Sequence, residues 1–577
     1  MSAAAPASGP HSAQDARATR IALALLLAVG AAGLARAIQL AWTCDDAFIS
    51  LRYARNLVDG LGLVYNAGER VEGYTNLLWT LLLAAGIRAG VDPLAVGSAA
   101  GIACYAGLAW TLARATLRRS REHGLPFLPL AAGSVLVSAD FHEWATGGLE
   151  TSLFGWLATA ALLHSRAALR SRAAALGTGA LLALLLLTRP DGLLFAVAAA
   201  LGLLAWPPRG VTRARALRGA ATLAALPSAA LACWIAWKLA YYGELLPTAF
   251  YSKSVLRPWY AQGVVYLGLY LEKNWFLAAA LLGAALARWR RRGTPLSDVD
   301  RDGLVFAAGA LLFLLYVTHV GGDFMFARRI LPAVPLLLLA VEGELVQLPL
   351  RQARVAVLAC VVGAALPHDV FGERALVRGI ADERRFYTDR AIAARRLQGR
   401  IVGEALAGTR ARVMFEGGMC AFGYWSGLPW LAEMSGLTQT SLAKLPLEGR
   451  GRPGHEKQAT DAWLDQQGVH FVVSQRFPPI ERPDTAPLDA VYFGDVAMAR
   501  VVHYDEAIMQ HLRGVPGVRF TPIERVLEVR RREIARADRA EAERLYAWLE
   551  RFYLAGAGER GRAEAASLRS LIEAKPR

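Results

Sequence analysis

Two adjacent carboxylates, Asp45 and Asp46, are the residues of this 577-residue chain whose types and position best suit chemistry. They follow a mostly apolar run from Ile21 to Trp42, and about 20 such residues cross a bilayer as a helix. The pair is therefore expected at the membrane surface, where it can meet a lipid-borne substrate. The alternative is a structural role, because aspartates commonly cap helices. Repulsion within the pair favours a neutralising arginine or divalent cation, such as Mg²⁺, Mn²⁺ or Ca²⁺.

Four cations lie at the ends of later apolar runs, namely Arg189, Lys253, Arg328 and Arg329. A single cation in such a position usually extends its charge into the headgroup layer and binds nothing specific. Several cations together with an acidic pair can instead hold a phosphate that is anchored to a lipid. We expect at least two of the four to do so.

Composition places most of the chain in a membrane. Hydrophobic residues make up 55% of the sequence, and apolar stretches recur from residue 21 to about residue 367. The net charge of +16 comes from arginines in short loops, without a basic face interleaved with aromatic residues, so no binding of nucleic acid is expected. The five cysteines are scattered without metal-ligand spacing, and a disulfide between Cys44 and Cys420 is not expected.

Hydropathy and charge together predict eleven membrane spans with a cytoplasmic N-terminus. The run from Ile21 is expected to be a retained span and not a cleaved signal. The basic loops Arg209–Arg218 and Arg288–Arg292 mark the cytoplasmic side. They agree with the earlier basic loops only if the short segment Leu77–Ile87 enters and leaves on one face, as an interfacial or re-entrant helix. The predicted spans are 21–42, 93–117, 126–139, 148–165, 173–188, 190–206, 218–241, 262–287, 304–320, 329–347 and 353–367.

The chain divides by composition into a disordered cytoplasmic tail (1–20), a transmembrane domain (21–367) and a soluble, extracytoplasmic α/β domain (368–577). In the last part we expect a helix over 373–400, strands at 412–415 and 469–473, and two helices after residue 524. The polar loops 43–76, 140–148, 188–191, 242–261 and 319–329 all fall on the predicted outer face. Within the first of them, residues 46–59 are expected to lie as an amphipathic helix on the membrane.

These outer loops carry strings that resemble a known family. The first loop contains D-D-A-F-I-S-L-R-Y and G-E-R-V-E-G-Y-T-N-L-L-W, and later ones contain T-R-P-D-G, Y-G-E-L-L-P-T-A-F-Y-S-K and G-G-D-F-M-F-A-R-R. The chain is similar to the polytopic GT-C glycosyltransferases. Within them it resembles the bacterial branch of the terminal β-(1→2)-arabinofuranosyltransferases and of relatives connected with flagellar motor control.

The resemblance implies transfer of a sugar, an arabinofuranose-like pentose above all, from a polyprenyl-phosphate donor. The implied acceptor is a cell-envelope glycan or a lipid-linked molecule on the outer face of the bacterial cytoplasmic membrane. Asp45 and Asp46 are then the catalytic candidates, because glycosyl transfer needs a carboxylate to orient or deprotonate the acceptor hydroxyl. Which of the two is the base is left open. Arg189, Lys253, Arg328 and Arg329 become the candidates for binding the donor phosphate.

Further polar and aromatic residues of the matching strings are candidates for substrate binding. Each candidate also has a structural alternative. The acidic residues could cap helices or form ion pairs in loops, and the aromatic residues could form a belt at the membrane interface. His319 could be a hydrogen-bonded structural residue. The metal ligands, if any, are not identified. The substrate-binding candidates are Arg52, Glu72, Tyr74, Asn76, Trp79, Glu244, Tyr251, His319 and Asp323.

Two other interpretations stay open at this point. The motility connection of the relatives favours a non-catalytic membrane factor for envelope or flagellar motor assembly. A transporter ranks lower, since no inverted repeat or paired charge within a span is visible. In the C-terminal domain, Tyr424, Trp425 and Trp430 surround a Ser-Gly turn and could stack on a glycan, although aromatic residues at such turns more often serve packing.

Overall fold

The structure is a computed structural model that describes residues 10–474 and 487–576. Its contacts divide the chain into two compact units. We call them the helical unit (1–44, 75–245 and 255–386) and the mixed unit (45–74, 246–254 and 387–577). The division at residue 368 into a transmembrane domain and a soluble domain stays a prediction. The contacts add that residues 45–74 and 246–254, which lie within the predicted outer loops 43–76 and 242–261, fold with the C-terminal part of the chain.

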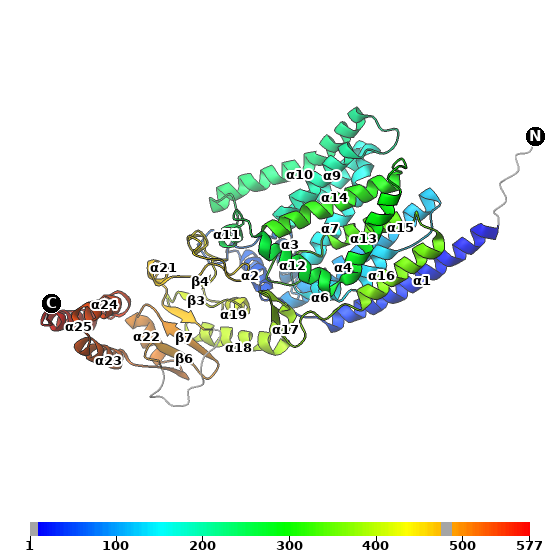
Figure 1. The fold of residues 1–577 in the computed structure, drawn as a ribbon. Coiled ribbons are helices and arrows are strands. Elements are labelled where there is room, and N and C mark those ends of the chain that lie inside the picture. The colour runs from blue at the N-terminus through cyan, green and yellow to red at the C-terminus, as the bar shows by residue number, and fades with distance from the viewer. Residues whose placement is uncertain (1–9, 475–486, 577) are drawn as a thin grey trace, which may run out of the picture. The chain divides into compact units, whose positions relative to one another are not determined.

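The helical unit is built from long Ala- and Leu-rich helices that pack along one another, for example α9 with α10 and α14 with α15 (Figure 1). Caps fix their ends: Asp92 accepts hydrogen bonds from the first turn of α4, and Ser297 and Asp300 form a capping box on α14. The helices are α1 (Pro10–Gln39), α3 (Leu77–Arg88), α4 (Pro93–His123), α5 (Leu130–Val137), α6 (Ala139–Thr146), α7 (Thr151–His164), α8 (Arg172–Thr188), α9 (Leu193–Ala205), α10 (Arg213–Tyr242), α12 (Tyr260–Lys273), α13 (Trp275–Arg290), α14 (Asp298–His319), α15 (Val334–Leu345) and α16 (Leu350–Ala365).

Every predicted span overlaps a helix, but two of the spans are interrupted. The segment 126–139 contains only the eight-residue α5, which Ser138 separates from α6. The segment 262–287 is divided into α12 and α13 at Asn274. Within the described part of the chain, four helices are long and apolar enough to cross a membrane, namely α1, α4, α10 and α14, and shorter apolar helices accompany them. The count of eleven spans therefore stays a prediction.

The mixed unit contains a six-stranded sheet in the order β4-β3-β5-β7-β6-β8. Strand β3 pairs in parallel with β4 and β5, whereas the remaining neighbours are antiparallel. All residues of β3, β4 and β5 are buried, as expected of parallel strands covered on both faces. The strands are β3 (Val413–Phe415), β4 (Leu431–Glu433), β5 (Phe471–Val473), β6 (Ala490–Phe493), β7 (Ala497–Val501) and β8 (Val518–Phe520).

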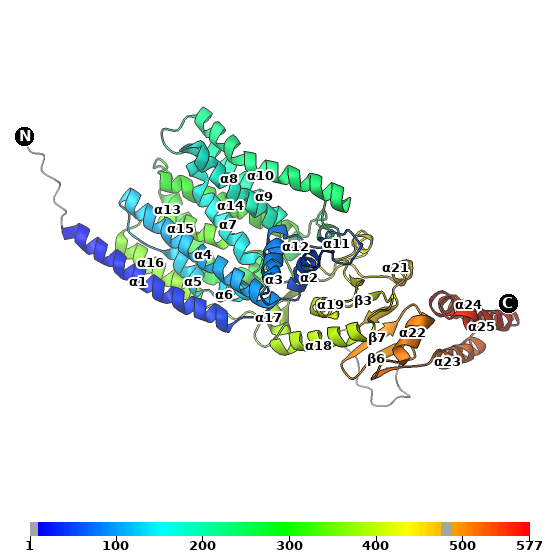
Figure 2. The same ribbon diagram turned by 180° about the vertical axis from the view of Figure 1, so that it is seen from behind.

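Helices of the mixed unit come from all three of its chain segments, and Figure 2 shows α18 and α22 beside strands β6 and β7. They are α2 (Ala47–Val58), α11 (Thr248–Ser252), α18 (Asp389–Ala405), α19 (Cys420–Ser426), α20 (Thr440–Ala443), α21 (Asp461–Gln466), α22 (Glu506–Arg513), α23 (Ile523–Arg536), α24 (Arg539–Leu549) and α25 (Gly558–Glu573).

Several local predictions are wrong. Residues 373–400 are not one helix. The positive φ angles of Arg378 and Gly379 turn the chain between β1 (Leu376–Val377) and β2 (Ile380–Ala381); the short α17 (Glu383–Phe386) follows, and α18 begins only after its cap, Thr388. Helix α1 begins at Pro10, inside the predicted disordered tail, whose residues 1–9 lie outside the described ones. Three helices, not two, follow residue 522.

The surface-lying helix predicted for residues 46–59 is also wrong. Helix α2 covers this stretch, but its residues 47–54 and Asn56 are buried on every face. It therefore packs inside protein instead of presenting one apolar face to lipid. The two strands predicted at 412–415 and 469–473 are confirmed as β3 and β5.

Candidate active site

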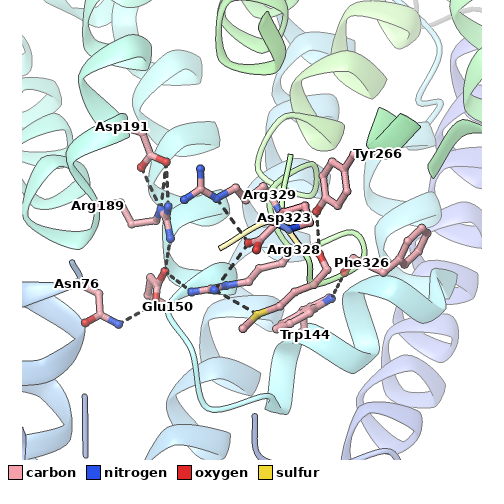
Figure 3. A network of polar contacts seen from close by, with 12 residues as sticks. Asn76, Trp144, Glu150, Arg189, Asp191, Tyr266, Asp323, Phe326, Arg328 and Arg329 are labelled. Atoms are coloured by element: carbon pink, nitrogen blue, oxygen red, sulfur yellow. Dashed lines mark hydrogen bonds and ion pairs between the residues drawn. The ribbon is translucent and has the colours of Figure 1, made fainter. Parts of the chain in front are cut away.

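A buried carboxylate, Glu150, gathers the polar residues of the helical unit (Figure 3). Its Oε1 accepts hydrogen bonds from Nη1 of Arg189 at 2.6 Å and from Nη2 of Arg328 at 3.1 Å, and its Oε2 accepts from Nδ2 of Asn76 at 2.8 Å. These partners come from three distant places in the sequence. Glu150 directly precedes α7, so its side chain can reach all three partners from the N-terminal end of that helix.

Two further carboxylates complete this network. Asp191, in the turn after Arg189, accepts from Nε of Arg189 at 2.9 Å. Asp323 lies 3.5 Å from Nε of Arg329 and 3.9 Å from Nη1 of Arg328, which is longer than a hydrogen bond. The three arginines thus face three carboxylates, and the cavity they line holds only about 10 Å³, roughly the space of one water. A phosphate could bind to these arginines only if a carboxylate moved.

The loop that carries Arg328 and Arg329 is held on several sides. The phenol of Tyr266 donates to the carbonyl of Met325 at 2.9 Å and accepts from the backbone N–H of Arg329 at 3.2 Å. The indole of Trp144 donates to the carbonyl of Phe326 at 3.0 Å. Buried Ala327 has a φ of 64°, which is strained for a residue with a Cβ. Such a conformation persists only where the surroundings impose it, so the loop is pre-formed.

The two interrupted spans meet beside this loop at Asp140, just after the break between α5 and α6. Its carboxylate accepts from Nζ of Lys273 at 2.7 Å and from Nδ2 of Asn274 at 2.9 Å, at the break between α12 and α13. The ammonium of Lys273 also lies 4.8 Å from the ring centroid of Phe326. Both helix breaks therefore connect to the arginine loop.

Other predicted residues of the helical unit lie at different places in it. The indole of Trp79 donates to the carbonyl of Gly148 at 2.9 Å, and Nδ1 of His319 lies 3.1 Å from the hydroxyl of Tyr260. Glu244 follows the end of α10. Within the described ranges, no group of three or more His, Cys, Asp or Glu side chains could hold a metal ion, and the five cysteines form no disulfide.

In the mixed unit, the backbone at the start of α19 holds the carboxylate of Asp45. Its Oδ2 accepts from the backbone N–H of Cys420 at 2.8 Å, and its Oδ1 accepts from that of Ala421 at 3.1 Å. The side chain is buried, and burial raises the pKa of its carboxyl to about 6 against the lowering effect of the two hydrogen bonds. Asp46 is only half-buried, at the start of α2. The two carboxylates that the sequence left equivalent are thus in different surroundings.

Arg52 is likewise committed to the protein itself. It donates to the carbonyls of Tyr65 at 2.7 Å, Gly423 at 2.8 Å and Leu428 at 2.7 Å. It is buried, and burial lowers the pKa of its guanidinium to about 10. These bonds hold residues 45–74 against α19, and substrate binding by Arg52 stays a prediction.

The remaining predicted residues fall in the mixed unit as well. The carbonyl of Glu72 accepts from the backbone N–H of Thr248 at 2.9 Å, and the ring of Tyr74 packs edge-on against that of Tyr53. The carbonyl of Tyr251 accepts from Nζ of Lys457 at 2.9 Å. Lys253 follows α11 in this unit, whereas the three predicted arginines belong to the helical unit.

Sequence reasoning missed Glu433, at the end of β4. Its carboxylate accepts from the backbone N–H groups of Ser435 at 2.9 Å and Leu437 at 3.3 Å. Burial raises its pKa to about 7, and the charge of Asp46 adds to that rise. The available signal was its place at the carboxyl end of a parallel strand, before a Ser-Gly turn, where α/β sheets commonly place polar sites.

Comparison with known proteins identifies relatives whose names give the activity that the sequence resemblance implied. A terminal β-(1→2)-arabinofuranosyltransferase from Corynebacterium glutamicum is 30% identical over 335 residues, which cover 52% of this chain and 48% of the relative. The enzyme of the same name from Mycobacterium tuberculosis is 28% identical over 326 residues, 51% of each chain. The chain thus spans about half the length of the curated relatives it matches. No family model matches it.

Among solved structures, ArnT from Cupriavidus metallidurans, crystallised with undecaprenyl phosphate, superposes with a TM-score of 0.52 at 11% identity. The match covers 83% of this chain and 97% of ArnT. The fold is of the GT-C type. The predicted fold class, a helical membrane protein with a smaller α/β part, is confirmed, and the chain is a multi-pass membrane protein.

Proposed function

We propose that this protein is a membrane glycosyltransferase that transfers a sugar, an arabinofuranose-like pentose, from a polyprenyl-phosphate donor to a glycan or lipid-linked acceptor. The observation that carries the proposal is that Arg328 and Arg329, on a pre-formed loop of a GT-C fold, lie with Arg189 around the carboxylates of Glu150 and Asp323. The activity in the names of the arabinofuranosyltransferase relatives and the undecaprenyl phosphate of the ArnT crystal support it.

The donor phosphate binds to Arg328 and Arg329 in this proposal. Asp323 lies 3.5 and 3.9 Å from their guanidinium groups, so a phosphate can replace these long contacts at smaller cost than the short bonds of Glu150. Glu150 and Asp191 keep Arg189 in place. A role of Lys253 in donor binding stays a separate prediction, because this residue belongs to the mixed unit.

Asp46 acts as the general base and Asp45 keeps it in position. The acceptor hydroxyl transfers its proton to Asp46 as its oxygen bonds to the anomeric carbon, and the bond from that carbon to the phosphate oxygen breaks. The polyprenyl phosphate leaves with the bonding electrons. The half-buried setting of Asp46 supports this choice, since the two oxygens of Asp45 already accept backbone hydrogen bonds.

The proposal places the protein in the bacterial cytoplasmic membrane, with its N-terminus inside and residues 368–577 outside. The arginine-rich predicted inner loops support this orientation. No step is assigned to a metal. A divalent cation that neutralises Asp46 and the donor phosphate is the alternative, in which case a chelator would abolish transfer and added Mg²⁺, Mn²⁺ or Ca²⁺ would restore it.

A non-catalytic role in envelope or flagellar motor assembly is the second candidate. The equal numbers of arginines and carboxylates around Glu150 favour it, because an ion network that serves only the fold is expected to be balanced. In that case the Asp46→Asn variant would fully complement a strain from which the gene has been deleted.

Transfer from a polyprenyl-phosphate arabinofuranose in membranes tests the proposal. Arg328→Gln and Arg329→Gln should weaken donor binding, since a charge-assisted phosphate contact contributes about 1.5–3 kcal/mol. Asp46→Asn should keep donor binding and lose turnover. Arg290→Gln, at the exposed end of α13, is the matched control. Wild-type membranes without transfer, or arginine variants with unchanged donor affinity, would contradict the assignment.

A further inference from the structure

A cavity of about 1150 Å³ lies along one side of the helical unit, larger than most small-ligand sites. The first half of α1 and one face of α16 form its two walls, and Figures 1 and 2 show these helices along the same edge of the unit. Residues 124–129, which join α4 to α5, form its floor. None of the residues assigned to the proposed reaction lines it.

The walls of this cavity are apolar side chains that remain accessible. On α1, Ile21 and Leu25 are 53% and 62% exposed, and on α16 Leu358 is 64% exposed. Such exposure is ordinary for one helix that faces lipid. Here the exposed side chains of two helices line the same hollow, so an apolar chain placed there would contact protein on two sides.

Both walls close onto α5 at one end of the cavity. A Cβ added at Gly33 of α1 would lie 2.4 Å from the carbonyl oxygen of Leu136, and one added at Gly133 would lie 3.1 Å from a methyl group of Val361 on α16. The lining residues of α1 accordingly extend only to Val29. The cavity is therefore a slot with one closed, apolar end.

Toward its other end the slot is lined by polar groups, and their charge has one sign. These groups are the guanidinium groups of Arg121 and Arg354 and the hydroxyl of Thr19, and no carboxylate is among the described residues that line the cavity. Neither guanidinium forms an ion pair with a described residue. Nearby Arg119, in contrast, is paired with buried Glu342. The slot thus offers two uncompensated positive charges.

The slot lies at the opposite end of α4 from the arginine network. A Cβ added at Gly97, near the start of α4, would lie 3.3 Å from Cα of Gly148, two residues before Glu150, whereas Ser120 near the end of α4 lines the slot. About 35 Å of helix separates the two places, and α4 is long and apolar enough to cross a membrane. The arginine-rich loops beside the slot predict the cytoplasmic leaflet for it.

We propose that this slot binds an anionic diacyl phospholipid of the cytoplasmic leaflet, with its phosphate on Arg121 and Arg354 and an acyl chain between α1 and α16. Charge complementarity selects this occupant, because two guanidinium groups without a carboxylate attract a phosphate at headgroup depth. A zwitterionic lipid would bring an ammonium group toward the same two arginines. The bound lipid would fasten α1 to α16 whether or not the protein transfers a sugar.

Native mass spectrometry of the full-length, detergent-solubilised protein with added dioleoyl phosphatidylglycerol or dioleoyl phosphatidylcholine tests the headgroup contacts. Phosphatidylglycerol should bind about tenfold more tightly, and Arg121→Gln and Arg354→Gln should each weaken its affinity about fivefold, as expected for a basic side chain near a membrane surface. Arg213→Gln is the matched control. Arg213 is exposed at the start of α10, in a predicted cytoplasmic loop, and does not line the slot, so this variant should bind phosphatidylglycerol normally.

Leu25→Trp tests the acyl chain, since a larger side chain would fill the slot without a change of charge. It should weaken the binding of dioleoyl phosphatidylglycerol and leave that of the short-chain dihexanoyl lipid unchanged. All the substituted side chains are exposed, so each variant should unfold at the wild-type temperature without added lipid. Added phosphatidylglycerol should then raise the unfolding temperature of the wild type and not that of the Arg121→Gln, Arg354→Gln double variant.

Four results would overturn the proposal. They are equal affinity for the two dioleoyl lipids, unchanged phosphatidylglycerol affinity in the double variant, an equal loss in Arg213→Gln, and tighter binding of a polyprenyl phosphate than of phosphatidylglycerol. An equal effect of Leu25→Trp on the long-chain and short-chain lipids would exclude an acyl chain between α1 and α16.

Discussion

At the scale of single residues, two carboxylates of the same type differ in burial and in hydrogen bonding. Asp45 and Asp46 are neighbours, yet one accepts two backbone hydrogen bonds in a buried place and the other is half-buried. A carboxylate held in this way contributes to stability, and a more accessible one can exchange a proton with a substrate. The proposed roles of anchor and base follow from that difference.

Substitution of each aspartate by asparagine should distinguish the two proposed roles. Asp46→Asn should lower turnover by a factor of about 10² to 10⁴ and leave thermal stability unchanged. Asp45→Asn should destabilise the protein by about 1.5–3 kcal/mol, because its amide NH₂ would face a backbone N–H that now meets a carboxylate oxygen. Unfolding curves and single-turnover rates of both variants measure the two effects. Equal effects of the two substitutions on stability would contradict the assignment.

Glu433 should give the protein a distinct pH dependence. Its pKa is raised from 4.5 to about 7, so between these pH values the folded state holds a proton that the unfolded state releases. Its contribution to the free energy of unfolding therefore falls as pH rises from 4.5 to 7, by up to about 3 kcal/mol. Glu433→Gln should gain stability relative to wild type on going from pH 5 to pH 8. A constant difference in unfolding free energy would contradict the raised pKa.

At the scale of elements, interrupted helices position the arginine loop. Asp140 at one break bonds Lys273 and Asn274 at the other, and Lys273, Trp144 and Tyr266 all contact the loop before Arg328. The breaks therefore serve the proposed phosphate site.

Tyr266→Phe should loosen this loop without removing any charge. The phenol makes two hydrogen bonds to the loop, each contributing about 0.5–1.5 kcal/mol, so donor affinity should fall roughly fivefold to a hundredfold with little change in kcat. Tyr270→Phe is the matched control: it lies one turn further along α12, and its hydroxyl makes no hydrogen bond with the described residues. An equal loss in both variants would point to packing and not to the loop.

At the scale of the whole molecule, the mixed unit depends on a segment from the start of the chain. Asp45 and Arg52 satisfy backbone groups of α19 and its neighbouring turns, and Asn66 donates to and accepts from Leu431 at the start of β4. Buried backbone groups that lose such partners each cost about 1–3 kcal/mol. Sequence distance therefore does not mark the limits of a folding unit here.

A fragment of residues 387–577 alone should accordingly fail to fold. Joining residues 45–74 to it through a Gly/Ser linker should restore protease resistance and a cooperative unfolding transition. Limited proteolysis and circular dichroism compare the two fragments. A stable 387–577 fragment would show that the first-loop contacts are dispensable.

Fusion reporters test the orientation in the membrane. A phosphatase that needs the periplasm, fused after Arg400, should be active, and a reporter that needs the cytoplasm should be silent at the same place. The reason is the odd number of predicted spans with arginine-rich loops inside. The reverse pattern would overturn both the span count and the outer placement of Asp45 and Asp46.

The sequence by itself determined the helical membrane class, the resemblance to GT-C glycosyltransferases and strands β3 and β5, because hydropathy and short motifs are local properties. It also singled out Arg189, Arg328, Arg329 and Asn76, which the structure gathers around Glu150 and Asp323. It could not tell which of these cations are paired, since their carboxylate partners lie far away along the chain.

Only the tertiary structure decided the surroundings of Asp45, Arg52 and Glu433 and the division of the chain into units. Asp45 and Arg52 make hydrogen bonds with backbone groups that are hundreds of residues away in the sequence. Glu433 accepts hydrogen bonds from the backbone of the turn that follows it. Burial and hydrogen-bond partners set the proton affinity and availability of a side chain, and neither can be read from its neighbours in sequence. The proposed chemistry of Asp46 therefore depends on packing that brings residues 45–74 and the C-terminal sheet into one compact unit.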